Sequence, residues 1–266
     1  MARQRLGQHF LADPAVRERI RASLPLRPND IWLEIGAGHG EMTQHLLGEG
    51  RRVIAVESDP RLVADLKKRQ SEWPGMSLIE GGILTLELAY NGLSPFHVYG
   101  NIPYYITSPI LHHLFEFAPN IRSIHLVIQR EVAERIVSRP RRKTYGYLSA
   151  LCQFYARPEL IFEIPPAAFR PPPKVRSALV SMSLPGEREH LGIAAEDEAR
   201  FLEFVQLCFA QKRKTLRNNL RSLAPPARST ERLAAALAAC GLRADARAEQ
   251  LALTDFAALF RALAPP

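Results

Sequence analysis

Cysteine is scarce in this chain of 266 residues, and long apolar runs are missing. Cys152, Cys208 and Cys240 are odd in number, lie far apart and lack the close spacing of metal ligands, which favours free thiols in a reducing cytosol over a disulfide or a zinc site. No stretch approaches the roughly 18 apolar residues of a membrane span, and the basic start leads into no apolar signal region. These absences predict a soluble cytoplasmic protein with no membrane segment and no bound metal.

Two loops that mark large enzyme classes are also missing. The chain has no Gly-x-Ser-x-Gly elbow and no Walker loop, which excludes the α/β-hydrolase and P-loop interpretations. His112 and His113 are adjacent and so face different sides of a helix, while His97 and His125 fall in or near strands without a carboxylate at metal spacing. The histidines are therefore expected to be surface or buried core residues and not metal ligands.

Short apolar runs alternate with amphipathic stretches through the first 184 residues, which is the pattern of a doubly wound α/β sheet. Seven strands are predicted over 31–35, 53–56, 77–79, 98–99, 124–128, 160–162 and 178–182. Helices are predicted over 14–24, 41–48, 60–70, 108–117, 131–138 and 146–155, because each has an apolar face at helical spacing.

The composition changes after residue 184. Pro185-Gly186 and the acidic stretch behind it predict a linker over 185–198. Helices are predicted over 198–223, over 230–240 with Gly241 as the residue after the C-cap, and over 253–263. We therefore expect a sheet domain over 1–184 and a small all-α domain over 199–266.

Positive charge is in excess and clustered. The formal net charge is +8, residues 139–143 carry four positive charges in a predicted loop, and residues 211–221 read as a basic helix. Arg213, Arg217 and Arg221 recur every four residues along that helix. Two such runs favour contacts with the phosphates of a polyanion.

A glycine turn follows the first predicted strand of the sheet, at Gly36-Ala37-Gly38-His39-Gly40. Ligands of open parallel sheets bind at this turn. Glu41 occupies the third-glycine position of a dinucleotide fingerprint, and its carboxylate would repel pyrophosphate, so S-adenosylmethionine fits better than NAD or FAD. Glu57 ends the second strand about twenty residues on, where an acid accepts ribose hydroxyls. Alternatively, Glu57 caps the helix that begins at Asp59-Pro60.

The stretch Asn101-Ile102-Pro103-Tyr104 is suited to hold an amino group on a planar ring. The Asn101 amide oxygen and the Ile102 backbone carbonyl would accept its two hydrogens and favour a pyramidal, nucleophilic nitrogen. Pro103 fixes its own φ and biases Ile102 toward an extended backbone, while Tyr104 offers a stacking ring, with Phe169 as a second ring. Tyr105 could equally serve as the stacking ring, but the Ile106 that follows it indicates that Tyr105 starts the next helix and packs in the core. On its own, Asn-Xaa-Pro is also common turn chemistry.

Eight motifs, taken in chain order, resemble those of the ribosomal RNA adenine dimethyltransferases: 6–11, 34–40, 56–57, 101–104, 129–135, 145–149, 169–175 and 211–220. The proline block and the basic C-terminal motif favour the small-subunit branch. The resemblance implies a Rossmann-like class I methyltransferase fold with a seven-stranded, mostly parallel sheet. It also implies dimethylation of N6 on two adjacent adenosines in the terminal hairpin loop of small-subunit rRNA, with the assembling small ribosomal subunit as partner and a monomeric enzyme.

The resemblance also assigns residues. The catalytic set is Asn101, Ile102, Pro103 and Tyr104, and the cofactor-binding set is His9, Leu11, Gly36, Gly38, Glu57, Gly82 and Asn101. Independently of the resemblance, we predict RNA contacts at Arg141, Arg142, Lys143, Lys174, Lys212, Arg213, Arg217 and Arg221. Two residues depart from the family pattern, which usually has Asn in place of His9 and an acid in place of Gly82. Because glycine has no side-chain acceptor, we expect weaker anchoring of the cofactor adenine, with Glu80 or a water as substitute.

Two other functions remain open from the sequence. The large-subunit rRNA adenine methyltransferases that confer macrolide-type resistance share the Asn-Xaa-Pro motif, although residues 169–175 and 211–220 count against this branch. The chain could instead be an assembly checkpoint that binds immature small subunits with catalysis secondary, an alternative that Gly82 keeps open.

Overall fold

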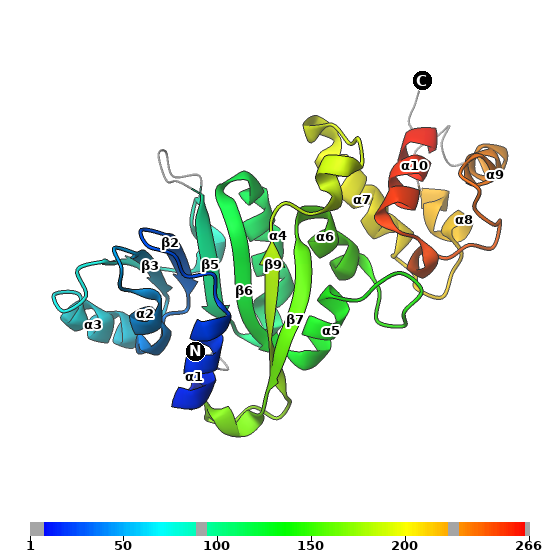
Figure 1. Cartoon of the computed structure of the whole chain (residues 1–266). Coiled ribbons are helices and arrows are strands. Elements are labelled where there is room, and N and C mark those ends of the chain that lie inside the picture. Colours follow the sequence, from blue (N-terminus) through cyan, green and yellow to red (C-terminus); the bar gives the residue numbers. More distant parts are fainter. Residues whose placement is uncertain (1–7, 89–94, 223–228, 264–266) are drawn as a thin grey trace, which may run out of the picture. The chain divides into compact units, whose positions relative to one another are not determined.

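The computed structural model describes residues 8–88, 95–222 and 229–263 (Figure 1). Residues 6 and 7 of the first motif and the predicted helix end at residue 223 lie outside the described residues. The described residues divide into two compact units, one within 1–133 and 157–184 and the other within 134–156 and 185–266. The division differs from the predicted domains, because residues 134–156 pack with the C-terminal helices. Phe154, for example, lies with its ring centroid 5.4 Å from that of Phe201.

The first unit is built on a seven-stranded sheet of order β4-β3-β2-β5-β6-β9-β7. The five neighbours from β4 to β6 pair in parallel, while β9 is antiparallel to both β6 and β7. In Figure 1, β5, β6, β9 and β7 lie side by side. The strands are β2 (Ile31–Ile35), β3 (Arg52–Glu57), β4 (Met76–Glu80), β5 (Phe96–Asn101), β6 (Ile121–Gln129), β7 (Arg157–Ile164) and β9 (Ser177–Ser183). The predicted seven-stranded, mostly parallel sheet is confirmed.

The helices of the sheet unit begin where the sequence carries start signals. Asp13 caps α1 by accepting from the backbone N–H groups of Ala15 and Val16, and Asp59 caps α3 by accepting from Arg61. A proline follows each cap, where its missing N–H costs nothing. The helices are α1 (Pro14–Ser23), α2 (Glu41–Leu46), α3 (Pro60–Arg69) and α4 (Thr107–Glu116), with short 3-10 helices η1 (Ile83–Thr85), η2 (Tyr104–Ile106), η3 (Ala118–Asn120) and η4 (Pro166–Ala168). Helix α5 (Arg130–Ile136) begins in this unit and ends in the second.

Two very short strands, which the sequence did not predict, form a second sheet. β1 (Phe10–Leu11) pairs antiparallel with β8 (Phe169–Arg170), and Ala12 and Asp13 both donate to the carbonyl of Ala168. Phe169 is fully buried in the core cluster with Leu11. A ring without exposed surface is not available to stack on a substrate base, so the suggestion that Phe169 serves as a stacking ring is wrong.

Hydrogen-bonded histidines lie in the core, as predicted. The Ser123 hydroxyl lies 2.6 Å from Nδ1 of His97 and 2.7 Å from Nε2 of His125. Trp32 stacks on His97 with ring centroids 4.8 Å apart. Burial lowers the pKa of both histidines, that of His125 to about 3, so His125 is neutral at physiological pH.

The second unit is helical, but not as the sequence predicted. Its elements are α6 (Tyr147–Tyr155), α7 (Glu198–Cys208), α8 (Leu216–Asn219), η7 (Leu220–Ser222), α9 (Thr230–Ala239), η8 (Ala248–Gln250) and α10 (Leu253–Leu263). The predicted linker holds η5 (Glu187–His190) and η6 (Ala195–Asp197), and Leu191 between them is buried. Gly241 has φ +68° directly after α9 and its cap, as expected. Among the described helices, none combines the length and apolarity needed to cross a membrane.

The single predicted helix over 198–223 is wrong, since α7 ends at Cys208 and α8 begins only at Leu216. The Asn219 side-chain amide closes the break by donating to the carbonyls of Cys208 (2.6 Å) and Gln211 (3.3 Å). Thr215 caps α8 by accepting from the backbone N–H of Asn218. The three arginines predicted to line one helix face therefore lie on a turn, on α8 and on η7.

Candidate active site

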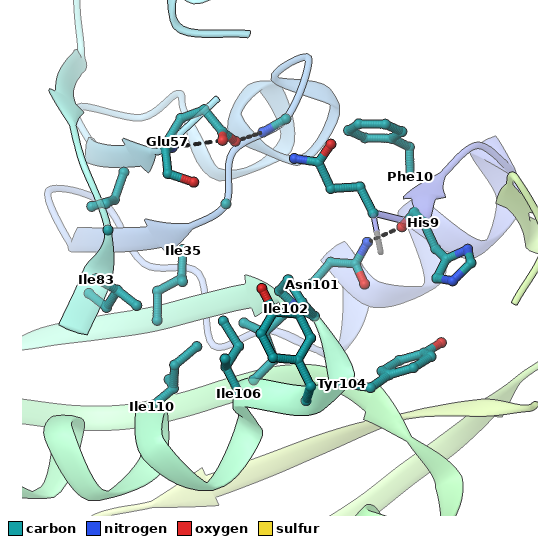
Figure 2. A pocket seen from close by; sticks show the side chains of 18 of the residues that line it. His9, Phe10, Ile35, Glu57, Ile83, Asn101, Ile102, Tyr104, Ile106 and Ile110 are labelled. Carbon is teal, nitrogen blue, oxygen red and sulfur yellow. Dashed lines mark hydrogen bonds between the residues drawn. The ribbon is translucent and has the colours of Figure 1, made fainter. Parts of the chain in front are cut away.

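A pocket opens at the carboxyl ends of β2, β3 and β5, with about 880 Å³ of empty space that is partly open to solvent (Figure 2). Most of the predicted site residues line it: His9, Gly36, Gly38, Glu57, Gly82, Asn101, Ile102, Pro103 and Tyr104. Leu11 instead lines a small adjoining cavity, together with Gly36, Gly38 and Asn101.

The glycine turn between β2 and α2 has a left-handed backbone at three places. The φ angles of Gly36, Gly38 and Gly40 are +70°, +62° and +82°. A side chain at Gly40 would lie 2.7 Å from the ring of Trp73, so that position also needs a glycine for space. A Cβ on Gly36 would come within 4.0 Å of the Asn101 carbonyl oxygen. The turn and the Asn101 loop therefore lie against each other, as predicted from their places at the ends of neighbouring strands.

Glu57 is buried at the end of β3, and its carboxylate is oriented by backbone donors. Oε2 accepts from the N–H of Gly38 at 2.9 Å, and Oε1 accepts from Ser58 at 2.7 Å and from Asp59 at 2.9 Å. A carboxylate has about four acceptor sites, so capacity remains for a further donor in the pocket. Glu57 thus contacts the turn before α3, but the cap of α3 is Asp59.

The side-chain amide of Asn101, at the end of β5, is held in one orientation. Its Nδ2 donates to the backbone carbonyl of His9 at 2.9 Å. Figure 2 shows the amide nitrogen turned toward that carbonyl and the amide oxygen on the opposite side, toward Tyr104. Because the donor side is engaged by His9, the amide presents Oδ1 as an acceptor.

The imidazole of His9 contacts both the backbone carbonyl of Pro171 and the ring of Tyr104. Nδ1 lies 2.7 Å from the carbonyl oxygen of Pro171, which can only accept, so the ring donates through Nδ1. The ring also stacks on Tyr104 with centroids 5.9 Å apart and planes inclined by 25°. These two contacts, and the hydrogen bond from Asn101 to the His9 carbonyl, could not be predicted from the sequence, because each joins residues far apart in the chain.

The two tyrosines after Pro103 have different environments. Tyr104 is half-buried, and its hydroxyl is hydrogen-bonded to Ser177 at 2.7 Å. Tyr105 lines the pocket and is 68% exposed. The expectation that Tyr105 packs in the core is wrong, because the tight 3-10 turn of η2 directs successive side chains about a third of a turn apart.

Gly82 leaves open space at the pocket. Its φ of −92° suits any residue, and a Cβ there would meet nothing within 4 Å. Glu80 forms an ion pair with Lys67 at 3.1 Å, outside the pocket lining. This contact argues against Glu80 as a substitute for the missing acid.

A buried carboxyl, that of Glu34, lies beneath the glycine turn and is not among the predicted site residues. Glu34 is 2% exposed and accepts from the Thr43 hydroxyl at 2.5 Å. Burial, aided by the nearby charges of Glu41 and Glu57, raises the pKa of Glu34 to about 8. Glu34 is therefore largely protonated at pH 7 and adds little negative charge there.

Comparison with known proteins identifies the family. The profile of the family described as Ribosomal RNA adenine dimethylase matches residues 1–264. The chain belongs to this family. It is 38% identical over 256 residues to Ribosomal RNA small subunit methyltransferase A of Xanthomonas campestris pv. campestris, covering 96% of this chain and 94% of the relative. It is 36% identical to the protein of the same description from Acinetobacter baylyi, covering 99% and 93%.

Two solved methyltransferase structures share the fold. A dimethyladenosine transferase from Plasmodium falciparum superposes with a TM-score of 0.76 at 25% identity, covering 94% of this chain and 96% of that one. The 23S rRNA methyltransferase ErmE superposes with a TM-score of 0.70 at 29% identity, covering 96% and 99%. The resemblance stated from the motifs is confirmed.

The pocket fits S-adenosylmethionine, the methyl donor of this family. The left-handed glycine turn lets a ligand approach the backbone closely, and Glu57 keeps acceptor capacity for ribose hydroxyls. Ile35, Ile83, Ile106 and Ile110 supply apolar walls for a purine ring. Glu41, at the start of α2, disfavours a pyrophosphate.

The predicted RNA-contact residues divide between the units. Lys174 is exposed in the sheet unit, and the other seven lie in the helical unit. There Lys212 donates through Nζ to the carbonyl of Lys143 at 2.5 Å, which brings together the two basic runs. Arg217 is half-buried, whereas the other six are exposed: Arg141, Arg142, Lys143, Lys212, Arg213 and Arg221.

Proposed function

We propose that this dimethylase acts on small-subunit (16S) rRNA, transferring methyl groups from S-adenosylmethionine to N6 of two adjacent adenosines in the 3′-terminal hairpin loop. The observation that carries the proposal is the fixed amide of Asn101, which presents an oxygen acceptor in the same pocket as the glycine turn and Glu57. The relatives named small-subunit methyltransferase A support the choice of RNA.

The residues of the pocket divide into those that hold the cofactor and those that prepare the nucleophile. Gly36 and Gly38 would hold the cofactor backbone, Glu57 the ribose, Gly82 the side of the adenine, and His9 and Leu11 the methionine end. When bound, S-adenosylmethionine supplies a methyl group activated by a sulfonium.

Asn101 prepares the adenosine for attack. Its Oδ1 accepts one N6 hydrogen and the Ile102 carbonyl accepts the other, which favours a pyramidal nitrogen whose lone pair is no longer delocalised into the ring. Tyr104 offers a ring face on which the base can stack. Pro103, with φ −58°, fixes the backbone turn between the Asn101 acceptor and the Tyr104 ring. The proton on the alkylated nitrogen is acidic and leaves to water, so no strong general base is required.

Asn101→Ala tests the assignment. We expect kcat to fall by about 10²–10³-fold, as for the removal of other preorganised hydrogen-bond partners. Asn120→Ala, at the opposite end of the sheet before β6, is the matched control and should keep wild-type turnover. Unmethylated small subunits are incubated with each protein, and the modified nucleosides are counted by mass spectrometry. Near-normal turnover of Asn101→Ala would refute the role of the amide.

Large-subunit rRNA serves as a competing substrate in the same assay, since the chain also superposes on ErmE. Methylation confined to the large-subunit RNA would overturn the choice of substrate. Calorimetry with S-adenosylmethionine separates an enzyme from an assembly checkpoint without catalysis, which would show no saturable cofactor site.

We further propose that the helical unit binds the RNA, that the partner is the assembling small subunit, and that the enzyme works as a cytoplasmic monomer. The hydrogen bond from Lys212 to the Lys143 carbonyl, which joins the two basic runs, supports RNA binding by the helical unit. Removing one side chain that binds a phosphate should lower the slope of log affinity against log salt by about one. Lys212→Ala and Arg213→Ala are the variants to compare, and an RNA affinity that does not change with salt would contradict the proposal.

A further inference from the structure

Tyr105 exposes an aromatic ring beside the proposed acceptor site. Its side chain is 68% exposed, whereas the other tyrosine, tryptophan and phenylalanine side chains that the structure describes are buried or half-buried. Single exposed apolar residues are common, but a ring that lines a ligand pocket is placed where a ligand can cover it.

The backbone under this ring is fixed. Tyr105 is the middle residue of η2, where the N–H of Ile106 donates to the carbonyl of Pro103 at 3.2 Å. The Thr107 hydroxyl donates to the carbonyl of Tyr104 at 3.3 Å, and α4 continues directly from this turn. Because the backbone under the ring is already ordered, only the Tyr105 side chain must lose conformational freedom when a base covers it.

Tyr104 and Tyr105 are suited to different bases. The Tyr104 hydroxyl is held by Ser177, and its ring stacks on His9, so this side chain is fixed against the pocket. Tyr105 has most of its ring surface open to solvent. One ring can therefore receive the base at Asn101 while the other receives a neighbouring base.

We propose that Tyr105 forms a second nucleobase-stacking site, which holds the nucleotide next to the adenosine whose N6 lies at Asn101. The inference rests on the proposed function, because the substrate carries its two target adenosines side by side. A single-stranded loop offers unstacked bases to aromatic side chains, and this stacking tolerates any base because every base has a π-face. Tyr105 would thus set the affinity for the loop and leave the chemistry at N6 to Asn101.

Three substitutions at Tyr105 separate stacking from burial and from the hydroxyl. Tyr105→Phe keeps the ring and should retain wild-type KM for unmethylated small subunits. Tyr105→Ala and Tyr105→Leu remove the ring, and KM should rise by about 5- to 150-fold, which corresponds to the 1–3 kcal/mol that stacking on one base contributes. In both variants kcat should stay within about twofold of wild type, because Asn101 and not Tyr105 prepares the nucleophile. Tyr105 lines the same pocket as Gly36 and Glu57, so the dissociation constant for S-adenosylmethionine is measured in parallel; a rise in it as large as the rise in KM would place Tyr105 against the cofactor and overturn the proposal.

Ile161→Ala is the matched control, since Ile161 is an apolar residue on the edge strand β7 that is 37% exposed. It should leave KM unchanged. If Tyr105→Leu keeps the wild-type KM, or if Tyr105→Phe loses as much affinity as Tyr105→Ala, the stacking site does not exist. If wild type itself leaves small-subunit rRNA unmodified, the proposed function fails instead, and the two failures are therefore distinguishable. Unchanged thermal melting confirms that the variants are folded.

Discussion

The buried carboxyl of Glu34 should make the stability of the sheet unit depend on pH. Burial raises its pKa to about 8, whereas an exposed glutamate titrates near 4.5. Between these two values the folded chain binds more protons than the unfolded chain. The free energy of unfolding should therefore fall as pH rises from 4.5 to 8, because the stabilising contribution of the neutral carboxyl is complete below 4.5 and is lost through 8.

The size of the effect follows from the difference between the two pKa values. One pKa unit corresponds to 1.36 kcal/mol, so the group can withdraw about 5 kcal/mol of stability over this range, as an upper limit if the site does not relax. Glu34→Gln removes the titration but keeps an oxygen that can accept the Thr43 hydroxyl. The added amide N–H groups need an acceptor, and the Tyr99 hydroxyl, buried without a described partner, lines the same small cavity.

Urea unfolding at pH values from about 5 to 9 measures the effect. The curve of unfolding free energy against pH should decline for wild type and be flatter for Glu34→Gln, so the variant gains relative stability steadily up to about pH 8. Glu72→Gln, which removes an exposed carboxyl just after α3, should run parallel to wild type. If the Glu34→Gln curve also runs parallel to wild type, Glu34 does not titrate in this range and the reasoning from burial is wrong.

Two further predictions concern glycines. Gly82→Asp places the missing acid where a Cβ meets nothing within 4 Å, and should tighten S-adenosylmethionine binding by about 5-fold, which corresponds to roughly one hydrogen bond. Calorimetry measures the dissociation constant, and weaker binding would contradict our account of the adenine site. Gly186→Ala puts a methyl 2.3 Å from the backbone nitrogen of Ala156, so it should destabilise the protein by about 3 kcal/mol or more in urea unfolding, whereas Gly146→Ala, with open space, should cost less than about 1 kcal/mol. Equal destabilisation of the two variants would contradict this prediction, because it would mean that the backbone around Gly186 moves to accommodate the methyl group.

The sheet and the pocket at its carboxyl end could be predicted because their signals are local. The central strands are short apolar runs, and β2 is buried along its whole length, as strands of parallel sheets usually are. Glu57 and Asn101 each end a strand. Since parallel strands present their carboxyl ends at one edge, the order of the residues in the chain was enough to bring them together.

What the sequence could not predict depends on contacts between distant residues. The break after Cys208 contains neither glycine nor proline and is closed by the side chain of Asn219. Strands β1 and β8 have two residues each, too few for any periodicity. The orientation of the Asn101 amide could not be predicted for the same reason. It depends on a hydrogen bond to the backbone carbonyl of His9, and a pattern of side chains contains no information about backbone carbonyls.

The carboxylates around the glycine turn explain why a turn that holds phosphates in other folds suits a different ligand here. Glu41 begins α2 and Glu57 binds the backbone of Gly38, while Glu34 beneath them is largely protonated at pH 7 and contributes little charge. The helix N-terminus that would attract a pyrophosphate thus lies among acids, which oppose that attraction. A cofactor with no phosphate and with positive charge on its sulfonium and amino groups is favoured by the same acids. We therefore infer that charge at the turn selects the class of cofactor, and we propose that the Asn101 amide at the end of β5 selects the amino group that receives the methyl.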